Sequence, residues 1–386
     1  MPEPRNPFIY GVPVPPSKFV GRKREVRTIF DQIAGPALGS VAINGEHRMG
    51  RTSLLHYIVD PDVAAGWGIA PDRYVLVYLD CQSISGFTPT RFWRRVLGLL
   101  PRWPGDEGPR GAVERLLSQE GVACSDLDAV LDGIHRSGRK LVLLLDEFEW
   151  AIRTDTEEDL ATTRDFLSGF RALVGRVPRA LSLVVATREP LEALCRPIRF
   201  IGSPFHTIFV SLTLRPFTRE EAEELIDEYL RGTGVEFSEE DRDFVYEVSG
   251  GHPYWLQNAC FKLFAGKPGG EGLYEEIAQA LRDEGLSVGP GLRVESGSVW
   301  VRGQPIEPLT DLEYRLLKLL YENAGKVCDK YEIVRSVWGE EYIEEVDDAR
   351  IAKLVSRLRR RIEPDPSNSR FIQTVRGRGY KLVIEP

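Results

Sequence analysis

A short stretch near the start of the chain has the residue types and spacing of a loop that holds phosphate. It reads Gly45-Glu-His-Arg-Met-Gly50-Arg51-Thr52, which fits G-x-x-x-x-G-[K]-[ST] with arginine at the lysine position. The glycines let backbone N–H groups close around phosphates at a helix N-terminus, and the Thr52 hydroxyl can reach Mg²⁺. Arg51 keeps the positive charge but presents a bulkier planar fork, so it does not simply replace an ammonium group.

A carboxylate pair further along the chain supplies a second chemical signal. Asp146 and Glu147 follow the apolar run LVLLLD (141–146), and Thr187 ends another, LSLVVATR (181–188). At the carboxyl end of a buried strand, Asp146 could coordinate Mg²⁺ and Glu147 could polarise an attacking water. Thr187 could sense a terminal phosphate. The alternative is that the acidic pair only caps a neighbouring helix.

The elements that must position these groups alternate between strand and helix. Apolar runs predict strands at 40–43, 74–80, 141–146, 181–188 and 207–213. Unbroken β-branched and leucine runs of this kind are typical of strands buried on both faces of a parallel sheet. We therefore predict an α/β core with a parallel sheet.

Composition and periodicity divide the rest of the chain. A proline-rich stretch at 1–17 predicts an extended strap before the core, which we place at 18–214. The pattern at 215–285 is helical only and predicts a lid. A glycine-rich break, EGLSVGPG, then leads into a last domain at 286–386.

These motifs, together with FVGRKREV (19–26) and GGHPYWLQ (250–257), resemble the AAA+/STAND-type P-loop ATPases over roughly residues 17–285. The likeness is to the archaeal and bacterial branch with a GGHPY-like motif in the lid. It implies binding of ATP or ADP with Mg²⁺. The residues it implies are Val20, Gly21 and Arg22 near the base; Gly45, Glu46, His47, Arg48, Met49, Gly50, Arg51, Thr52 and Ser53 around the phosphates; Thr52 and Asp146 on the metal; Glu147 on water; Thr187 as sensor; and His252 and Pro253 in the lid.

Arg51 departs from that family's lysine and leaves three outcomes open for the pocket. It could be an empty inherited scaffold, a tight nucleotide site with slow or no turnover, or an ordinary ATPase site. Arg188, Arg196 and Arg199 are candidates for an arginine that acts on a neighbouring copy's nucleotide. The Gly-Gly-His-Pro sequence before Tyr254 is also compatible with a plain helix-ending turn.

A basic helix is predicted near the end of the chain, over 347–362. Its apolar residues share one face at helical spacing, and its basic residues gather on another. The apolar set is Ile351, Leu354, Val355, Leu358 and Ile362; the basic set is Arg350, Lys353, Arg357, Arg360 and Arg361. Such a basic face can reach phosphates and guanine edges in a major groove. A basic solvated helix is the alternative.

The sequence TVRGRGYKL then predicts a hairpin with Arg376 and Arg378 at its tip, suited to a minor groove or to the DNA backbone. Residues 309–386 closely resemble the OmpR/PhoB-type winged-helix DNA-binding domain in their L-T-x-x-E opening, V-W-G helix end, S-R-L-R-R helix and T-V-R-G-R-G-Y hairpin. Strands at 292–308 would supply that fold's N-terminal sheet. The resemblance implies a small α+β winged-helix domain on double-stranded DNA, with 347–362 in the major groove and 375–380 in the minor groove.

Charge and cysteine usage set broader bounds. The net charge of −8 is uneven, because residues 290–386 carry 17 basic against 16 acidic residues while the rest is clearly acidic. The five cysteines, Cys81, Cys124, Cys195, Cys260 and Cys328, form no C-x-x-C pair, which disfavours a zinc site or a disulfide framework. Without a long apolar run or a signal-peptide pattern, we expect a cytoplasmic protein with no membrane partner.

Together these features predict a DNA-binding transcriptional regulator whose P-loop NTPase core and helical lid bind an adenine nucleotide. Nucleotide state would control self-association and DNA binding, with slow ATPase activity as an open question. Two alternatives remain at this stage. One is a DNA-dependent ATPase of a mobile-element or defence assembly, and the other is a nucleotide-free scaffold that carries a DNA-binding domain.

Overall fold

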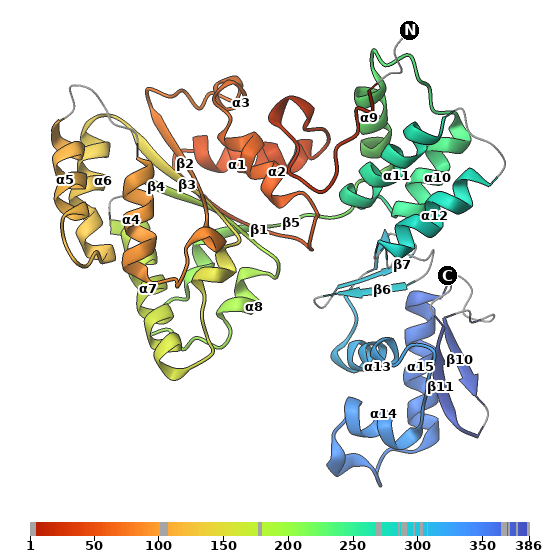
Figure 1. The fold of residues 1–386 in the computed structure, drawn as a ribbon. Helices are drawn as coiled ribbons and strands as arrows, with labels where there is room; N and C mark the ends of the chain where they lie inside the picture. The colour runs from red at the N-terminus through yellow and green to blue at the C-terminus, as the bar shows by residue number, and fades with distance from the viewer. Residues whose placement is uncertain are drawn as a thin grey trace. The chain divides into compact units, whose positions relative to one another are not determined.

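The computed structural model describes most of the chain. The described residues are 5–100, 107–176, 180–267, 272–284, 286, 292–295, 298–301, 304–306, 308–363, 369, 371–375 and 377–383. Gly11–Arg215 forms one unit, and the segment up to Tyr10 joins the residues from Pro216 onward in a second. Figure 1 shows the elements of both units.

A five-stranded parallel sheet forms the centre of the first unit. Its strands are β1 (Ser40–Asn44), β2 (Tyr74–Asp80), β3 (Lys140–Asp146), β4 (Leu181–Thr187) and β5 (Phe209–Thr213). The strand order is β2-β3-β4-β1-β5, so β4 lies between β1 and β3. Because all strands are parallel, the segments after β1, β3 and β4 emerge at one edge of the sheet. This confirms the predicted parallel α/β core.

Helices cover both faces of this sheet (Figure 1). On one face, α1 (Lys23–Ala34), α2 (Arg51–Val59) and α3 (Pro61–Gly66) pack against strand residues such as Val142 and Leu144. The other face, with Leu143, is covered by α4 (Pro89–Leu99), α5 (Glu107–Leu117), α6 (Asp128–Arg136), α7 (Glu157–Arg176) and α8 (Leu191–Cys195). The unbroken apolar run of β3, from Leu141 to Leu145, follows from this two-sided burial.

The lid is entirely helical, as predicted. It consists of α9 (Arg219–Leu230), α10 (Glu239–Ser249), α11 (Pro253–Gly266) and α12 (Leu273–Asp283). Reciprocal capping boxes start α9, between Thr218 and Glu221, and α10, between Ser238 and Asp241. They satisfy backbone N–H groups that the first turn of a helix leaves unpaired.

The last domain is a small α+β winged helix, also as predicted. An antiparallel sheet of β6 (Leu292–Glu295), β7 (Ser298–Val301) and β8 (Gln304–Pro305) precedes α13 (Asp311–Glu322), β9 (Val327–Cys328), α14 (Lys330–Val337) and α15 (Asp348–Ile362). A hairpin of β10 (Ile372–Val375) and β11 (Gly379–Leu382) pairs with β9. The five apolar residues of α15 named above are buried in this domain's core.

The five cysteines are free thiols, and all but Cys124 are buried. Within the described part of the chain, no helix is long and apolar enough to span a bilayer.

Candidate nucleotide site and DNA-binding face

The phosphate-loop candidate runs from the end of β1 to the start of α2. Left-handed backbone at Arg48 (φ 62°) and Gly50 (φ 90°) turns the chain into α2, whose first residue is Arg51. Gly45 cannot easily be replaced, because a Cβ there would lie 3.1 Å from the Leu214 Cβ. The glycines at both ends of the loop thus allow its tight path over the sheet edge.

Arg51 is buried, with 5% of its surface exposed, and reaches the acidic residues after β3. Its Nη2 donates to Glu147 Oε1 at 2.8 Å. Its Nη1 lies 3.9 Å from Glu149 Oε1, and among the described residues it meets no acceptor within hydrogen-bond distance. One arm of the guanidinium fork is therefore engaged, and the other lacks a hydrogen bond.

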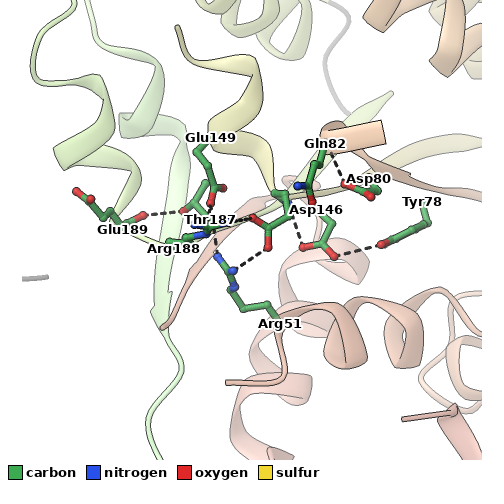
Figure 2. Close-up of polar contacts among 10 residues, drawn as sticks. Arg51, Tyr78, Asp80, Gln82, Asp146, Glu149, Thr187, Arg188 and Glu189 are labelled. Atoms are coloured by element: carbon green, nitrogen blue, oxygen red, sulfur yellow. Dashed lines mark hydrogen bonds and ion pairs between the residues drawn. The ribbon is translucent and has the colours of Figure 1, made fainter. Parts of the chain in front are cut away.

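Arg188 completes an ion-pair network around this site (Figure 2). It follows β4 and places Nη2 3.4 Å from Glu147 Oε2 and Nε 3.3 Å from Glu149 Oε1. Glu147 holds its position with a left-handed backbone (φ 45°). Burial, with a contribution from the Glu147 carboxylate, raises the pKa of Glu149 to about 7. Glu149 was missed by the sequence reasoning, although its place in Asp-Glu-Phe-Glu was a usable signal.

Asp146 lies beside the network, with 2% of its surface exposed. Its Oδ2 accepts from the Tyr78 hydroxyl at 3.1 Å, and its Oδ1 accepts from the Glu147 N–H at 3.0 Å (Figure 2). Burial raises the pKa of Asp146, while a hydrogen bond from Thr52 opposes that shift most strongly. The two candidate metal ligands, Asp146 and Thr52, are thus brought together.

The oxygen donors of Asp146 and Thr52 suit Mg²⁺, a hard cation that keeps several waters and also takes substrate phosphates. Within the described residues, no cluster of three or more histidine, cysteine or acidic side chains could hold a metal alone. A magnesium ion here would therefore take its remaining ligands from nucleotide phosphates and water. The sequence reasoning did not identify Tyr78, the residue that orients Asp146.

Thr187 is fully buried at the end of β4, where it pairs with Asn44 of β1. Its hydroxyl donates to the Glu189 carbonyl at 2.7 Å. The next residue, Arg188, extends into the ion-pair network instead. At this strand end the arginine, rather than the threonine hydroxyl, is the group that meets the site's other charges.

Of the residues predicted near the base, Arg22 contacts the phosphate loop. Gly21 (φ 75°) and Arg22 (φ 57°) make a left-handed turn into α1. The Arg22 side chain is buried, and its Nη2 donates to the Met49 carbonyl at 3.3 Å. Val20 is half-buried beside this turn. Arg22 therefore links the segment before α1 to the loop.

The other loop residues differ in exposure. Met49 is buried, Glu46 is half-buried, and His47 and Arg48 are exposed. Partial burial and the nearby charge of Arg48 lower the pKa of His47. The Ser53 hydroxyl accepts a hydrogen bond from the Val14 N–H at 3.2 Å.

His252 and Pro253 lie at the start of α11 in the second unit. His252 is the buried N-cap residue and Pro253 is the first helical residue. Proline favours this position, because its missing N–H would be unpaired there anyway. A role for the two residues toward a nucleotide stays a prediction.

The predicted DNA-binding face lies on α15 of the winged helix. Arg350, Lys353, Arg357 and Arg360 are exposed. The Arg350 guanidinium lies 5.7 Å from the centre of the Trp338 ring, which fixes part of its course. Arg361 differs, because it is half-buried and its Nη2 donates to the Pro308 carbonyl at 3.3 Å.

The hairpin carries the other residues predicted to contact DNA. Arg378 is exposed in the turn between β10 and β11, and Arg376 lies outside the described residues. A cavity of about 620 Å³ lies between α14, α15 and the hairpin, with Lys330, Ile351 and Arg378 in its lining. Arg359, which the sequence reasoning did not single out, donates to the Ile372 carbonyl at 2.6 Å and to the Thr374 hydroxyl at 2.9 Å.

Comparison with known proteins supports the reading of this last domain. Residues 303–382 match the family model "Transcriptional regulatory protein, C terminal". The uncharacterized transcriptional regulatory protein YcbL of Bacillus subtilis is 44% identical over 90 residues, which are 23% of this chain and 38% of that protein. The KDP operon transcriptional regulatory protein KdpE of Escherichia coli is 32% identical over 130 residues, which are 31% and 57% of the two chains. The chain thus spans about half the length of these curated relatives, or less.

Solved structures resemble the chain over nearly its whole length. The Walker-type ATPase PABY2304 of Pyrococcus abyssi has a TM-score of 0.51 at 12% identity and covers 94% of this chain and 93% of its own. The ORC2 protein of Aeropyrum pernix, solved as ADPNP-ADP complexes, has a TM-score of 0.50 at 15% identity and covers 98% and 93%. Likeness at these identities concerns the fold. The chain therefore joins an AAA+ ATPase-like fold to a C-terminal DNA-binding domain of the OmpR/PhoB-type transcriptional regulators.

Proposed function

We propose that this chain is a DNA-binding transcriptional regulator whose AAA+-like core binds an adenine nucleotide and thereby controls self-association and DNA affinity. The observation that carries the proposal is the state of Arg51. A buried guanidinium at the first position of α2 has one arm on Glu147 and one arm, Nη1, without a hydrogen bond among the described residues. The carboxylate oxygen Glu149 Oε1 lies 3.9 Å from Nη1, so this arm can still take a phosphate oxygen at hydrogen-bond distance.

An arginine can bind Glu147 and a phosphate at the same time, which suits this site better than a lysine would. A guanidinium presents its donors in a fixed plane, so one arm can stay on Glu147 while the other meets a phosphate oxygen. The backbone N–H groups at the start of α2 add the positive end of the helix dipole. Replacement of the usual lysine by Arg51 is therefore compatible with nucleotide binding.

The acidic residues favour binding over fast turnover. When bound, Mg²⁺ would supply charge neutralisation for the phosphates, and Asp146 and Thr52 would hold it. Glu147, the candidate for orienting water, forms ion pairs with both Arg51 and Arg188. A glutamate held in this way is poorly placed to accept a proton from water, so we infer slow or no hydrolysis.

Regulation requires that the nucleotide bind two assembly states with different affinity. An entering phosphate would compete with Glu149 for Arg51 and Arg188, so it would rearrange the charges at the edge of the sheet. Pairing two winged helices on adjacent half-sites then raises affinity through effective concentration. The relatives YcbL and KdpE are transcriptional regulatory proteins, which favours transcription as the process controlled.

The first experiment is equilibrium binding of labelled ATP, with and without Mg²⁺, to the full chain and to Asp146→Ala. We expect binding with a Kd of about 1 μM or tighter, and weaker binding of Mg²⁺-ATP to the variant. An absence of binding at millimolar ATP would overturn the proposed nucleotide site and leave a DNA-binding scaffold.

The second experiment titrates DNA with the empty, ADP-bound and ATP-bound protein. We expect both the midpoint and the number of chains per DNA to depend on the nucleotide. Identical titrations in all three states would exclude the switch even if ATP binds. Sustained, DNA-stimulated turnover that Glu147→Gln abolishes would instead assign the chain as a DNA-dependent ATPase.

A further inference from the structure

The segment before the core is anchored in the lid by its aromatic residues. Phe8 is 3% exposed and stacks on Tyr229 at 5.5 Å and on Phe237 at 5.7 Å between ring centres. Tyr10 makes edge contacts with Tyr254 and Phe261 of α11, at 5.9 and 5.1 Å. Phe8 thus belongs to the hydrophobic interior of the lid and the half-buried Tyr10 packs against α11, although the whole ATPase-like core separates them from the lid in sequence.

Polar contacts fix the same segment along α11. The Asn6 Nδ2 donates to the Phe261 carbonyl at 2.7 Å, and the Ile9 N–H donates to Gln257 Oε1 at 3.1 Å. Tyr254, Gln257 and Phe261 follow one another at spacings of three and four, so they lie on one face of α11. This is the helix that begins at Pro253.

A few residues later, the chain is anchored on the helix that carries the phosphate loop. The Val14 N–H donates to Ser53 Oγ at 3.2 Å. Phe19 stacks on Tyr57 at 4.4 Å, with the ring planes 20° apart. Ser53 and Tyr57 are one turn apart on α2, which begins at Arg51.

The connection between the two anchors is very short. Only Gly11, Val12 and Pro13 separate Tyr10 from Val14. At about 3.3–3.6 Å per residue, four steps along the chain span at most about 14 Å. While both anchors hold, Tyr10 and Val14 therefore cannot separate by more than this length.

We propose that residues 5–19 are a tether that couples the lid to the phosphate-loop helix, in addition to the covalent link at Arg215–Pro216. A displacement of α2 is passed through Val14 and the short connection to Phe8 and Tyr10, and so to α11. The mechanical coupling stands independently of the proposed function. Only the identity of the signal, a nucleotide at the phosphate loop, rests on it.

The test uses hydrogen exchange on the nucleotide-free full chain. Phe8→Ala removes the lid anchor and should raise amide exchange in α2, on the far side of the connection. Tyr274→Phe is the matched control, because it removes the hydroxyl bond to Asp241 in the lid without touching the tether. We expect faster exchange in α2 for Phe8→Ala and unchanged exchange in α2 for Tyr274→Phe. Unchanged exchange in α2 for Phe8→Ala would overturn the tether.

A second variant covers the case in which Phe8→Ala unfolds the lid. An insertion of about twelve Gly/Ser residues between Gly11 and Val12 leaves both anchors intact. It lowers the effective concentration of the lid anchor at its site, when the α2 anchor is bound, by about tenfold. We expect exchange in α11 to rise by up to that factor, whereas Val12→Ala, at a residue 64% exposed, should have no effect. Exchange in α11 that is indifferent to the insertion would contradict the coupling.

Addition of Mg²⁺-ATP separates this inference from the proposed function. If ATP binds and slows exchange in α11 in the native chain but not in the lengthened chain, the tether carries the nucleotide signal. If ATP does not bind and the nucleotide-free results hold, the tether stands and the nucleotide switch fails. If ATP slows exchange in α11 equally in both chains, the tether is not the route and the inference is overturned.

Discussion

The arginines of the phosphate loop and those of α15 present the same group in opposite environments. Arg51 is buried and already paired with a glutamate, whereas Arg357 is exposed on the outer face of its helix. An anion that approaches Arg51 finds one arm held by Glu147 and must compete with Glu149 for the other, but a DNA phosphate that approaches Arg357 displaces only water and counterions. The Arg51 site can therefore be selective for a shaped ligand, while the exposed arginines of α15 attract any polyanion.

The two regions should also respond differently to salt. Exposed charges are screened over about 10 Å at 0.1 M salt, and buried pairs much less. Release of counterions from DNA makes its binding fall steeply with salt concentration. We therefore expect nucleotide binding to change little over a salt range in which DNA binding is lost.

The largest effect should come from removing the buried cation. Arg51→Ala leaves Glu147 and Glu149 side by side without their buried partner, and we expect a loss of about 3 kcal/mol in the free energy of unfolding. Urea denaturation at pH 8 measures it. Arg188→Ala, which removes a half-exposed partner of the same glutamates, is the matched comparison and should cost clearly less. Equal losses of unfolding free energy for the two variants would mean that the burial of Arg51 does not increase its contribution to stability.

A smaller effect should follow from the residue that orients Asp146. Tyr78→Phe removes the hydroxyl that donates to Asp146 Oδ2. Loss of such an outer-shell partner weakens metal-dependent binding by about tenfold or more. We expect this loss in the Kd for Mg²⁺-ATP, and no change in the binding of ATP without metal. A parallel loss in both would place Tyr78 in packing rather than in metal orientation.

Two arginines of α15 should contribute differently to DNA binding. Arg357→Ala should weaken DNA binding and reduce the slope of log affinity against log salt by about one unit, as expected for one phosphate contact. Arg361→Ala should leave that slope unchanged, because Arg361 donates to Pro308 inside the domain. Fluorescence anisotropy at several salt concentrations measures both. The opposite result would reassign the DNA-facing side of the helix.

The smallest effect concerns pH. Burial raises the pKa of Glu149 to about 7 from its usual 4.5, so the folded chain holds this proton more tightly than the unfolded chain. Its contribution to stability is full below pH 4.5 and is lost as the pH rises through about 7. Glu149→Gln should remove this decline and add about 1 kcal/mol at pH 8, after allowance for solvent screening. Urea midpoints at pH 5 and pH 8 measure it, and a variant that is less stable at pH 8 would contradict the assignment.

Much of the fold could be predicted because its local signals agree. The run LVLLLD predicts a strand buried on both faces, and it forms β3 with helices on either side. The helical spacing of apolar and basic residues in α15 likewise predicts a buried and an exposed face. Ile351 and Leu358 are buried, while Arg357 is exposed.

The arrangement of the site was less accessible to sequence reasoning. The ion pairs that Arg51 and Arg188 form with the glutamates depend on β4 lying between β1 and β3 and on the left-handed backbone of Glu147. None of these leaves a periodic pattern in the sequence. Phe8 is a similar case, because its partners Tyr229 and Phe264 lie far along the chain and only the tertiary fold brings them together.

The hydrogen bonds of Arg359 to β10 have a consequence for the kind of DNA that the winged helix would select. These bonds fix α15 and the hairpin to each other. The two elements therefore cannot move independently to fit DNA grooves of different width. The duplex has to make the adjustment, and the energy of that deformation depends on its base steps. If α15 lies in the major groove and the hairpin in the minor groove, as the family resemblance implies, base pairs that no side chain touches would still be discriminated through their stiffness.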